Sequence, residues 1–403
     1  MTRTTIASVL FGMAAASAAA PQPEGAEGSR LSLDPPAAAR AAAYRLSPAS
    51  EGLLLSWHEP GDEGVRLCWS RLTDAGWCGA RVVTAQRTGV VANWADVPAV
   101  VEGGDGAMYA HWLRSGGGAS YDIVALRSTD GGETWRELGQ LNDDDVKGEH
   151  GFVSYVAHED GVRAYWLDGR EISGGHGESD AHTGRMTLRT ALVGETIAPS
   201  ELVDDSVCDC CNTAAAATPS GPVVVYRDRA HGEIRDISIA GGGLGGIGAV
   251  HEDGWVMPGC PVNGPAIAAD GERVVVVWYT GSPAPSIKAA FSTDGGKTFG
   301  DAIVVDKAAA DTVPLGRVDV VLDGEEAVVC WLRDERHKGA LLAQRVGPAG
   351  VVGEPVKVAP MEGSRQSGFP QMERLGDRLL IVWRDIEGER LRATEVAAAS
   401  IGR

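Results

Sequence analysis

The sequence predicts an all-β protein that closes into a β-propeller of four-stranded blades, and three observations predict it. Seven short apolar runs each end on an aromatic residue and recur along the 403-residue chain. Their spacing runs from 52 residues (Trp331 to Trp383) to 60 residues (Trp166 to Tyr226), a period typical of one propeller blade. Helical periodicity is nearly absent, and 54 glycines fit many tight turns. The aromatic ends are Trp57, Trp112, Trp166, Tyr226, Trp278, Trp331 and Trp383.

Each repeat divides into four strands. In the second copy we expect them at residues 97–102, 107–113, 121–128 and 134–140. The seventh copy ends after three strands, so we expect Ser29–Asp34 to supply its fourth strand and close the ring, as propellers do to protect their edges. Seven copies favour seven blades, with six blades and a decorated edge as the fallback.

The amino terminus reads as a secretory signal peptide. Residues 1–20 carry Arg3, a stretch of apolar and small residues, and an Ala-x-Ala site ending at Ala20. Residues 21–28 are expected to be a disordered leader, and residues 29–403 a single propeller domain. We therefore expect a secreted protein, periplasmic or extracellular. No later run reaches the roughly 18 apolar residues of a membrane span.

The net charge of −19 limits the partners that the chain can bind. This negative charge disfavours binding to nucleic acid and to anionic membrane surfaces. A local group of arginines could still bind a small anion. We expect a monomer that binds a small molecule or a glycan.

The strand pattern also predicts where a site would form. In a blade, the loops that lead into strand one and out of strand two open on one face, here called the top face. The chemically unusual segments fall mostly in those loops, within the third to fifth copies and the copies beside them. This concentration predicts one site on the top face.

Four of the seven cysteines fall in these top-face loops, namely Cys208, Cys210, Cys211 and Cys260. In an oxidising compartment they could form disulfides between neighbouring loops. They could instead hold a thiophilic metal such as copper or zinc, or carry out redox chemistry. Of the others, Cys68 and Cys78 could bridge a hairpin of the first copy, and Cys330 reads as a buried free thiol.

Two copies carry a matching octapeptide between strands three and four, Ser128–Trp135 and Ser292–Phe299. Its aspartate suits backbone hydrogen bonds in a turn, and its glycine pair tolerates positive φ. These segments resemble the Asp boxes (BNR repeats) of sialidase-type propellers. The segments CDCCNT and GCPVNGPAI resemble an exported bacterial branch of that superfamily. In the family the boxes are structural and lie on the face opposite the active site.

The resemblance implies a carboxylate ligand, such as an anionic sugar, in a central top-face pocket. A sialidase grips the carboxylate with converging guanidinium groups. The arginines that could do so here are Arg170, Arg227, Arg235 and Arg317. The alternative is that each pairs with a nearby aspartate as a structural ion pair. Other residues expected to contact the ligand are Trp94, Asp96, His150 and Asn263.

The resemblance also implies a glycoside hydrolase of the exo-sialidase type. The acid–base candidates are Glu149, Asp168 and Asp228, and Tyr226 is the candidate nucleophile. Tyr226 occupies the repeated aromatic position, however, which favours a packing role. The Arg-Ile-Pro sequence of known sialidases is absent. Two other functions stay open: a metal-binding or redox protein built on the four top-face cysteines, and a non-catalytic interaction propeller.

Overall fold

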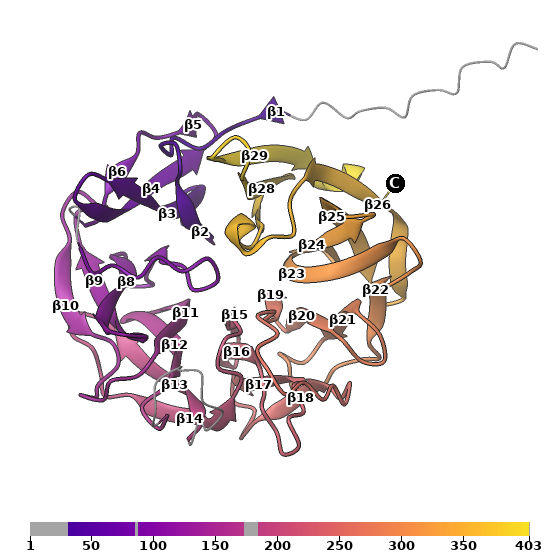
Figure 1. Cartoon of the computed structure of the whole chain (residues 1–403), viewed down its shortest axis with the longest axis horizontal. Helices are drawn as coiled ribbons and strands as arrows, with labels where there is room; N and C mark the ends of the chain where they lie inside the picture. Colours follow the sequence, from indigo (N-terminus) through magenta and orange to yellow (C-terminus); the bar gives the residue numbers. More distant parts are fainter. Residues whose placement is uncertain (1–30, 85–87, 173–183, 403) are drawn as a thin grey trace, which may run out of the picture.

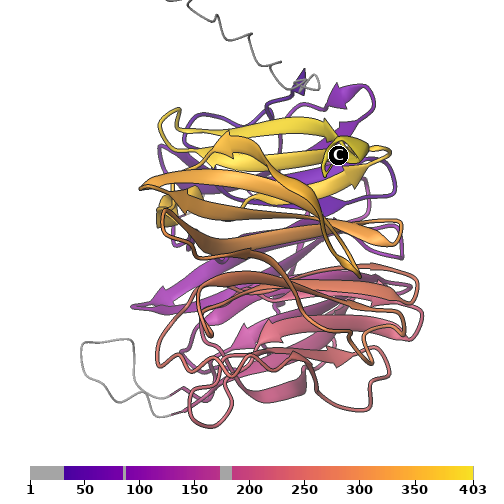
Figure 2. The ribbon, with the colours of Figure 1, turned by 90° about the vertical axis from the view of Figure 1, so that its right-hand side faces the viewer.

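The computed structural model describes residues 31–84, 88–172 and 184–402, which form seven antiparallel sheets. The sheets are arranged radially around a central axis (Figure 1), and in the side view they stack face against face (Figure 2). The predicted seven-bladed propeller is confirmed, and the six-bladed fallback is wrong. The proposed signal peptide and leader lie outside the described residues.

Blades one to three follow one another along the chain. Blade one consists of β2 (Ala42–Pro48), β3 (Leu53–Gly61), β4 (Gly64–Thr73) and β5 (Gly76–Trp77), with β6 (Arg81–Val82) also paired to β4. Blade two consists of β7 (Val100–Glu102), β8 (Met108–Gly117), β9 (Ser120–Ser128) and β10 (Arg136–Gln140). Blade three consists of β11 (His150–His158), β12 (Gly161–Asp168), β13 (Met186–Val193) and β14 (Glu201–Val207).

Blades four to six repeat the same order. Blade four consists of β15 (Ala214–Thr218), β16 (Gly221–Arg227), β17 (Ile237–Gly241) and β18 (Gly248–His251). Blade five consists of β19 (Ala266–Asp270), β20 (Arg273–Thr280), β21 (Ser286–Ser292) and β22 (Ile303–Lys307). Blade six consists of β23 (Thr312–Asp323), β24 (Glu326–Glu335), β25 (Lys338–Gly347) and β26 (Gly350–Pro360).

Blade seven is completed by the other end of the chain, as expected. Its strands are β27 (Gln371–Leu375), β28 (Arg378–Asp385), β29 (Arg390–Ala397) and β1 (Leu31–Ser32). β1 pairs with β29 in antiparallel register, and Arg392 contacts Asp34 at 2.6 Å. Within the described ranges the helical segments are the short 3-10 turns η1 (Arg365–Ser367) and η2 (Ala398–Ser400), and no helix there is long and apolar enough to cross a membrane.

The core is divided into layers between blades. Seven clusters of buried apolar residues lie among the described residues, one for each pair of neighbouring sheets. The repeated aromatics belong to these layers, and the side chains of Trp57, Trp166, Tyr226, Trp278 and Trp331 are fully buried. The sequence period therefore reflects one large side chain per layer.

Each of these five buried aromatics donates its polar hydrogen to a carboxylate. Trp166 Nε1 donates to Asp168 at 2.9 Å, and the Tyr226 hydroxyl donates to Asp204 at 2.6 Å. Buried Trp and Tyr normally require such a partner. The same contact recurs from Trp57 to Glu59, from Trp278 to Asp253 and from Trp331 to Asp306. Asp168 and Tyr226 thus take part in a structural contact that repeats around the ring.

The two Asp boxes form identical turns between the third and fourth strands of blades two and five. Asp130 accepts hydrogen bonds from Ser128 and Thr134, and Asp294 does the same in the second box. Gly132 has a φ of +82°, and a Cβ atom there would lie 2.3 Å from the Trp69 ring of blade one. Glycine is required because the turn packs directly on the neighbouring blade.

Candidate functional site

A channel of about 720 Å³ follows the propeller axis and is lined by the innermost strands. Its wall differs from one side to the other. On blades four and five the lining consists largely of small apolar residues, Ala214–Ala217 and 265–269. On the other blades polar side chains line it, among them Arg45, Tyr155, Asp319 and Glu373. The volume lies in the range of ligand pockets.

Arg45, near the middle of β2, is an unusual residue of this channel. Among the described residues its guanidinium group makes no hydrogen bond and no ion pair within 4 Å. Asp319 and Glu373 act on it only through longer-range electrostatics, and burial lowers its pKa. The hydroxyl group of Tyr155 likewise donates to no described residue, and burial raises its pKa. These two donor groups therefore face the channel without an acceptor among the described residues.

Asp319 and Glu373 place two carboxyl groups beside Arg45. Asp319 accepts the N–H of Met372 at 2.7 Å and of Val320 at 2.9 Å. Burial raises the pKa of Asp319 to about 6, against the effect of these hydrogen bonds. Burial and the charge of Asp319 raise the pKa of Glu373 to about 8. Near neutral pH, Glu373 is therefore mostly protonated and Asp319 mostly ionised, which makes an acid and a base available in the channel.

The predicted arginine clamp on the top face does not form, because each guanidinium group is held by different partners. Arg170 contacts Asp168 at 2.8 Å, Asp143 at 2.9 Å and Asp144 at 3.1 Å. These contacts lower the pKa of Asp168 despite its burial. His150 is buried beside them, with Nε2 3.4 Å from Asp144. The structure thus brings Asp168, Arg170 and His150 together as a structural ion-pair group.

Arg227 lies in a second, separate environment. It is 1% exposed, and it donates to the carbonyl oxygens of Asn263 (2.9 and 2.7 Å), Arg235 (2.5 Å) and Tyr279 (2.7 Å). Its guanidinium also lies over the Trp255 ring at 4.9 Å. The side chain of Arg235 is paired with Glu233 at 2.6 Å. Nε and both terminal nitrogens of Arg227 are therefore occupied by carbonyl oxygens, whereas Arg235 is paired through Nη2 and its buried Nε has no partner among the described residues.

Arg317 lies in a third environment, where loops meet above the channel. It donates to the carbonyl oxygens of Gly363, Ser364 and Gly368, and burial lowers its pKa to about 10. Its guanidinium stacks on Trp94 at 5.0 Å, and Trp94 stacks on Phe369 at 5.8 Å. Trp94 was predicted to contact a ligand; here its ring packs against Arg317 and Phe369.

Asp96 and Asn263 connect neighbouring blades. Asp96 accepts the N–H of Phe152 at 2.7 Å, and Asn263 accepts that of Arg317 at 2.9 Å. The same junction is made by Asn212 with Gly264 and by Asp319 with Met372. A Cβ atom at Gly151 would lie 1.8 Å from the Asp96 carboxylate, so a larger residue here would displace Asp96.

Two of the predicted carboxylates keep a raised pKa in these surroundings. Burial, with the charge of Glu149 as a smaller cause, raises the pKa of Asp96 to about 7. Burial and the charge of Asp204 raise the pKa of Asp228 to about 6. Neither residue lines the channel, and Tyr226, the candidate nucleophile, is 0% exposed with a pKa raised by burial. None of the predicted catalytic residues Glu149, Asp168, Tyr226 and Asp228 lines the channel.

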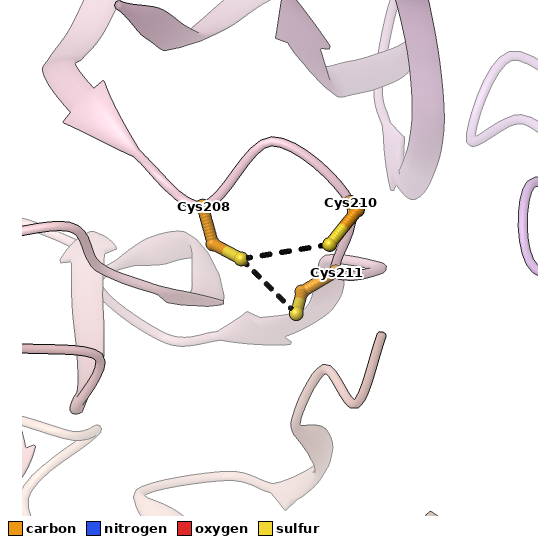
Figure 3. A group of neighbouring side chains, drawn as sticks. All are labelled: Cys208, Cys210 and Cys211. Carbon is orange, nitrogen blue, oxygen red and sulfur yellow. Dashed lines mark hydrogen bonds between the residues drawn. The ribbon is translucent and has the colours of Figure 1, made fainter. Parts of the chain in front are cut away.

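The four top-face cysteines lie close together, as Figure 3 shows for three of them. The sulfur of Cys208 is 3.2 Å from that of Cys211 and 4.0 Å from that of Cys210. Cys260, on the loop before β19, interacts with Cys210. Hydrogen bonds with Cys210 and Cys211 lower the pKa of Cys208. All seven cysteines are free thiols in the structure, so the disulfide alternative, including the Cys68–Cys78 bridge, is not seen; Cys330 is buried, as expected.

Comparison with known proteins finds similarity of fold and not of sequence. No family model and no curated protein matches the chain. An ulvan lyase of a polysaccharide lyase family matches with a TM-score of 0.50 at 11% identity, over 90% of this chain and 92% of that one. The intramolecular trans-sialidase of Ruminococcus gnavus matches with a TM-score of 0.45 at 12% identity, over 90% and 95%. A protein of unknown function from Dyadobacter fermentans gives a TM-score of 0.47 at 14% identity, over 91% and 97%.

The fold is a seven-bladed β-propeller of four-stranded antiparallel blades. At these identities the likeness concerns the fold alone, so the residues of this propeller must be judged by their own contacts. On those contacts, the residues that sequence reasoning missed are Arg45, Tyr155 and Glu373. One sequence signal could have found them. Each is a polar residue inside the innermost strand of its blade, whereas the innermost strand of blade four, β15, consists mostly of alanines.

Proposed function

We propose that this propeller binds a small organic carboxylate in its axial channel, with Arg45 gripping the carboxylate group. The observation that carries the proposal is the guanidinium group of Arg45, which lines a cavity of about 720 Å³ and has no hydrogen-bond or ion-pair partner among the described residues. Arg45 is half-buried and faces the channel, so its donors are available to a ligand, and a carboxylate offers the planar, two-oxygen acceptor that fits them. The proposal keeps the ligand class expected from the sequence and moves its site from the top-face loops to the channel.

Charge disfavours a dianion. Arg45 contributes one positive charge, Asp319 one negative charge, and Glu373 is largely neutral because its pKa is raised to about 8. A dianion such as phosphate would face Asp319 with no second cation to balance it. The protonated Glu373 and the Tyr155 hydroxyl are available as additional hydrogen-bond donors. The alanine wall of β15 and β19 suits the less polar body of the ligand.

D-Glucuronate is the probe that tests this proposal. It is a monocarboxylate sugar acid, and the ulvan lyase of similar fold was solved with an oligosaccharide that contains glucuronate. D-Glucose has the same ring without the carboxylate and is the matched control ligand. Isothermal titration calorimetry on the full chain should detect glucuronate binding and no glucose binding.

Arg45→Met and Arg374→Met form the matched pair of variants. Arg374 also lines the channel, but its guanidinium contacts Asp323 at 2.5 Å. Loss of a charge-assisted hydrogen-bond pair should weaken glucuronate binding about 10- to 100-fold in Arg45→Met, whereas Arg374→Met should bind normally. The proposal is wrong if glucuronate and glucose bind equally, if phosphate binds in place of glucuronate, or if both variants bind like the parent chain.

Sialoside hydrolysis is not included in this proposal, because Tyr226 is buried and hydrogen-bonded to Asp204. The residues available for acid–base chemistry in the channel are Asp319 and Glu373. Export through a leader ending at Ala20 is part of the proposal, since it would bring the channel to extracellular ligands. Amino-terminal sequencing of the mature protein from a secreting host would test it, with Pro21 as the expected first residue.

A further inference from the structure

The four top-face cysteines do not line the channel, and they form a second site that the carboxylate proposal does not use. This thiol cluster consists of Cys208, Cys210 and Cys211, on the loop between β14 and β15, and Cys260, on the loop before β19. Cys208 and Cys211 are each 1% exposed, Cys210 is half-buried and Cys260 is exposed. Buried sulfurs therefore lie beneath sulfurs that solvent can reach.

We infer that the thiol cluster binds one monovalent copper ion, with Cys208, Cys210 and Cys211 as ligands and Cys260 closing the site from the neighbouring loop. The ligand atoms of Cys208, Cys210 and Cys211 all lie within 4.8 Å of one another. Metal–sulfur bonds of about 2.3 Å place ligand sulfurs about 3.8–4.0 Å apart in tetrahedral or trigonal sites. The sulfur separations of 3.2 and 4.0 Å from Cys208 lie near that range, so small side-chain movements suffice for coordination.

The side chains in Figure 3 point toward one another from a short loop held at both ends. Cys208 donates its N–H to the carbonyl of Arg227 in β16. Asn212, next to Cys211, accepts the N–H of Gly264 from the loop that carries Cys260. A Cβ atom at Gly264 would lie 1.9 Å from the Asn212 carbonyl oxygen, so the two loops are in direct contact. The backbone thus positions all four cysteines before any metal binds.

Charge around the cluster suits bound thiolates. Each thiol that coordinates copper releases a proton, so three thiolates around one Cu(I) leave a net charge of −2. Arg227 acts electrostatically on Cys208 and Cys211. At Cys260 the charge of Asp209 opposes that of Arg235, and Asp209 is itself paired with Arg229 at 3.3 Å. The guanidinium groups that fail to form a ligand clamp therefore lie where an anionic metal–thiolate group needs positive charge.

The donor set selects a soft ion. Sulfur is the only ligand type in the group, and thiolates bind both Cu(I) and Zn(II). The sulfurs that lie within 4.8 Å of one another are three, a number that suits Cu(I), whereas a structural zinc site would need exposed Cys260 as a full fourth ligand. The contrasting group is Asp144, His150 and Asp168, which also brings ligand atoms together. There the guanidinium of Arg170 already contacts both carboxylates, and it supplies the positive charge that a metal ion would bring.

Copper titration of the reduced full chain under anaerobic conditions tests the inference. Cu(I) would be delivered as a complex with a chromogenic chelator, and native mass spectrometry would count the ions bound. We expect one copper per chain, and X-ray absorption should show sulfur as the only ligand. Cys208→Ser should weaken copper binding by more than the roughly 10- to 100-fold typical of losing an outer-shell partner.

Two further variants keep the test valid if Cys208→Ser fails to fold. Cys210→Ser changes a half-buried ligand and should also lose affinity, whereas Cys78→Ser changes an exposed cysteine outside the cluster and should bind copper normally. Thermal unfolding of each variant checks its fold. The inference is overturned if the reduced chain takes up no copper, if Zn(II) binds and Cu(I) does not, or if folded Cys210→Ser binds copper like the parent. Isolation of the mature protein with Cys208–Cys211 and Cys210–Cys260 disulfides that exclude copper would overturn it as well.

Discussion

Arg227 and Arg45 are both arginines deep inside the same propeller, yet their surroundings are opposite. Arg227 donates to the carbonyls of three residues and stacks on Trp255. Arg45 has no hydrogen-bond or ion-pair partner among the described residues and faces a channel. One guanidinium is a structural part of the loop layer, and the other is available to a ligand.

The contrast shows how to tell a binding arginine from a structural one. The number of arginines on a face says little, because irregular loops expose carbonyl oxygens that also need donors. An arginine can supply five donors to such a region, more than any other side chain. The useful criterion is whether those donors are already occupied by protein acceptors.

The largest expected effect is on stability in Arg227→Met. Removing this side chain leaves three buried carbonyl oxygens without their donor and opens space beside Trp255. We expect the free energy of unfolding to fall by about 3–5 kcal/mol. Urea denaturation followed by tryptophan fluorescence would measure it. Arg227→Lys should restore less than half of the loss, since an ammonium group cannot reproduce the planar fork.

Arg317→Met should show a smaller loss of the same kind. Arg317 donates to three carbonyls, but it is less deeply buried than Arg227, and Trp94 still packs on Phe369 without it. We expect a decrease of about 2 kcal/mol in the free energy of unfolding. A decrease as large as that of Arg227→Met would show that Trp94 and Phe369 depend on Arg317 for their position.

How far the sequence could predict these features follows from the kind of contact each one makes. The blades were predictable because one buried aromatic recurs per layer, as at Trp166 and Trp278. The face on which the cysteines meet followed from the same period. The clamp was not predictable, since whether Arg227 meets a ligand or three carbonyls depends on loop paths that no local pattern records. Arg45 was missed because a single polar residue in an apolar strand gives no periodic signal.

Glu373→Gln tests the electrostatics of the channel through pH. The pKa of Glu373 is about 8 in the folded state, so it stays protonated where the unfolded chain, with an ordinary value of 4.5, is ionised. Stability from this group is therefore complete below pH 4.5 and is lost as pH rises toward 8, by at most about 1.4 kcal/mol per pH unit. Glu373→Gln should flatten that decline between pH 5 and 8, measured by urea denaturation at each pH. Glu354→Gln, on exposed β26, is the control and should leave the decline as it is.

The smallest expected effect is on the stability of Arg45→Met. This measurement decides whether Arg45, unlike Arg227, is available to a ligand. This variant breaks no hydrogen bond to a described residue and removes the partial desolvation cost of a half-buried charge, but it also removes a cation that stabilises the ionised forms of Asp319 and Glu373. These contributions oppose each other, so we expect the free energy of unfolding at pH 7 to change by less than about 1 kcal/mol. Urea denaturation beside Arg227→Met gives the direct comparison. A loss similar to that of Arg227→Met would mean that Arg45 is structural after all, and the channel would then lack the free guanidinium on which carboxylate binding depends.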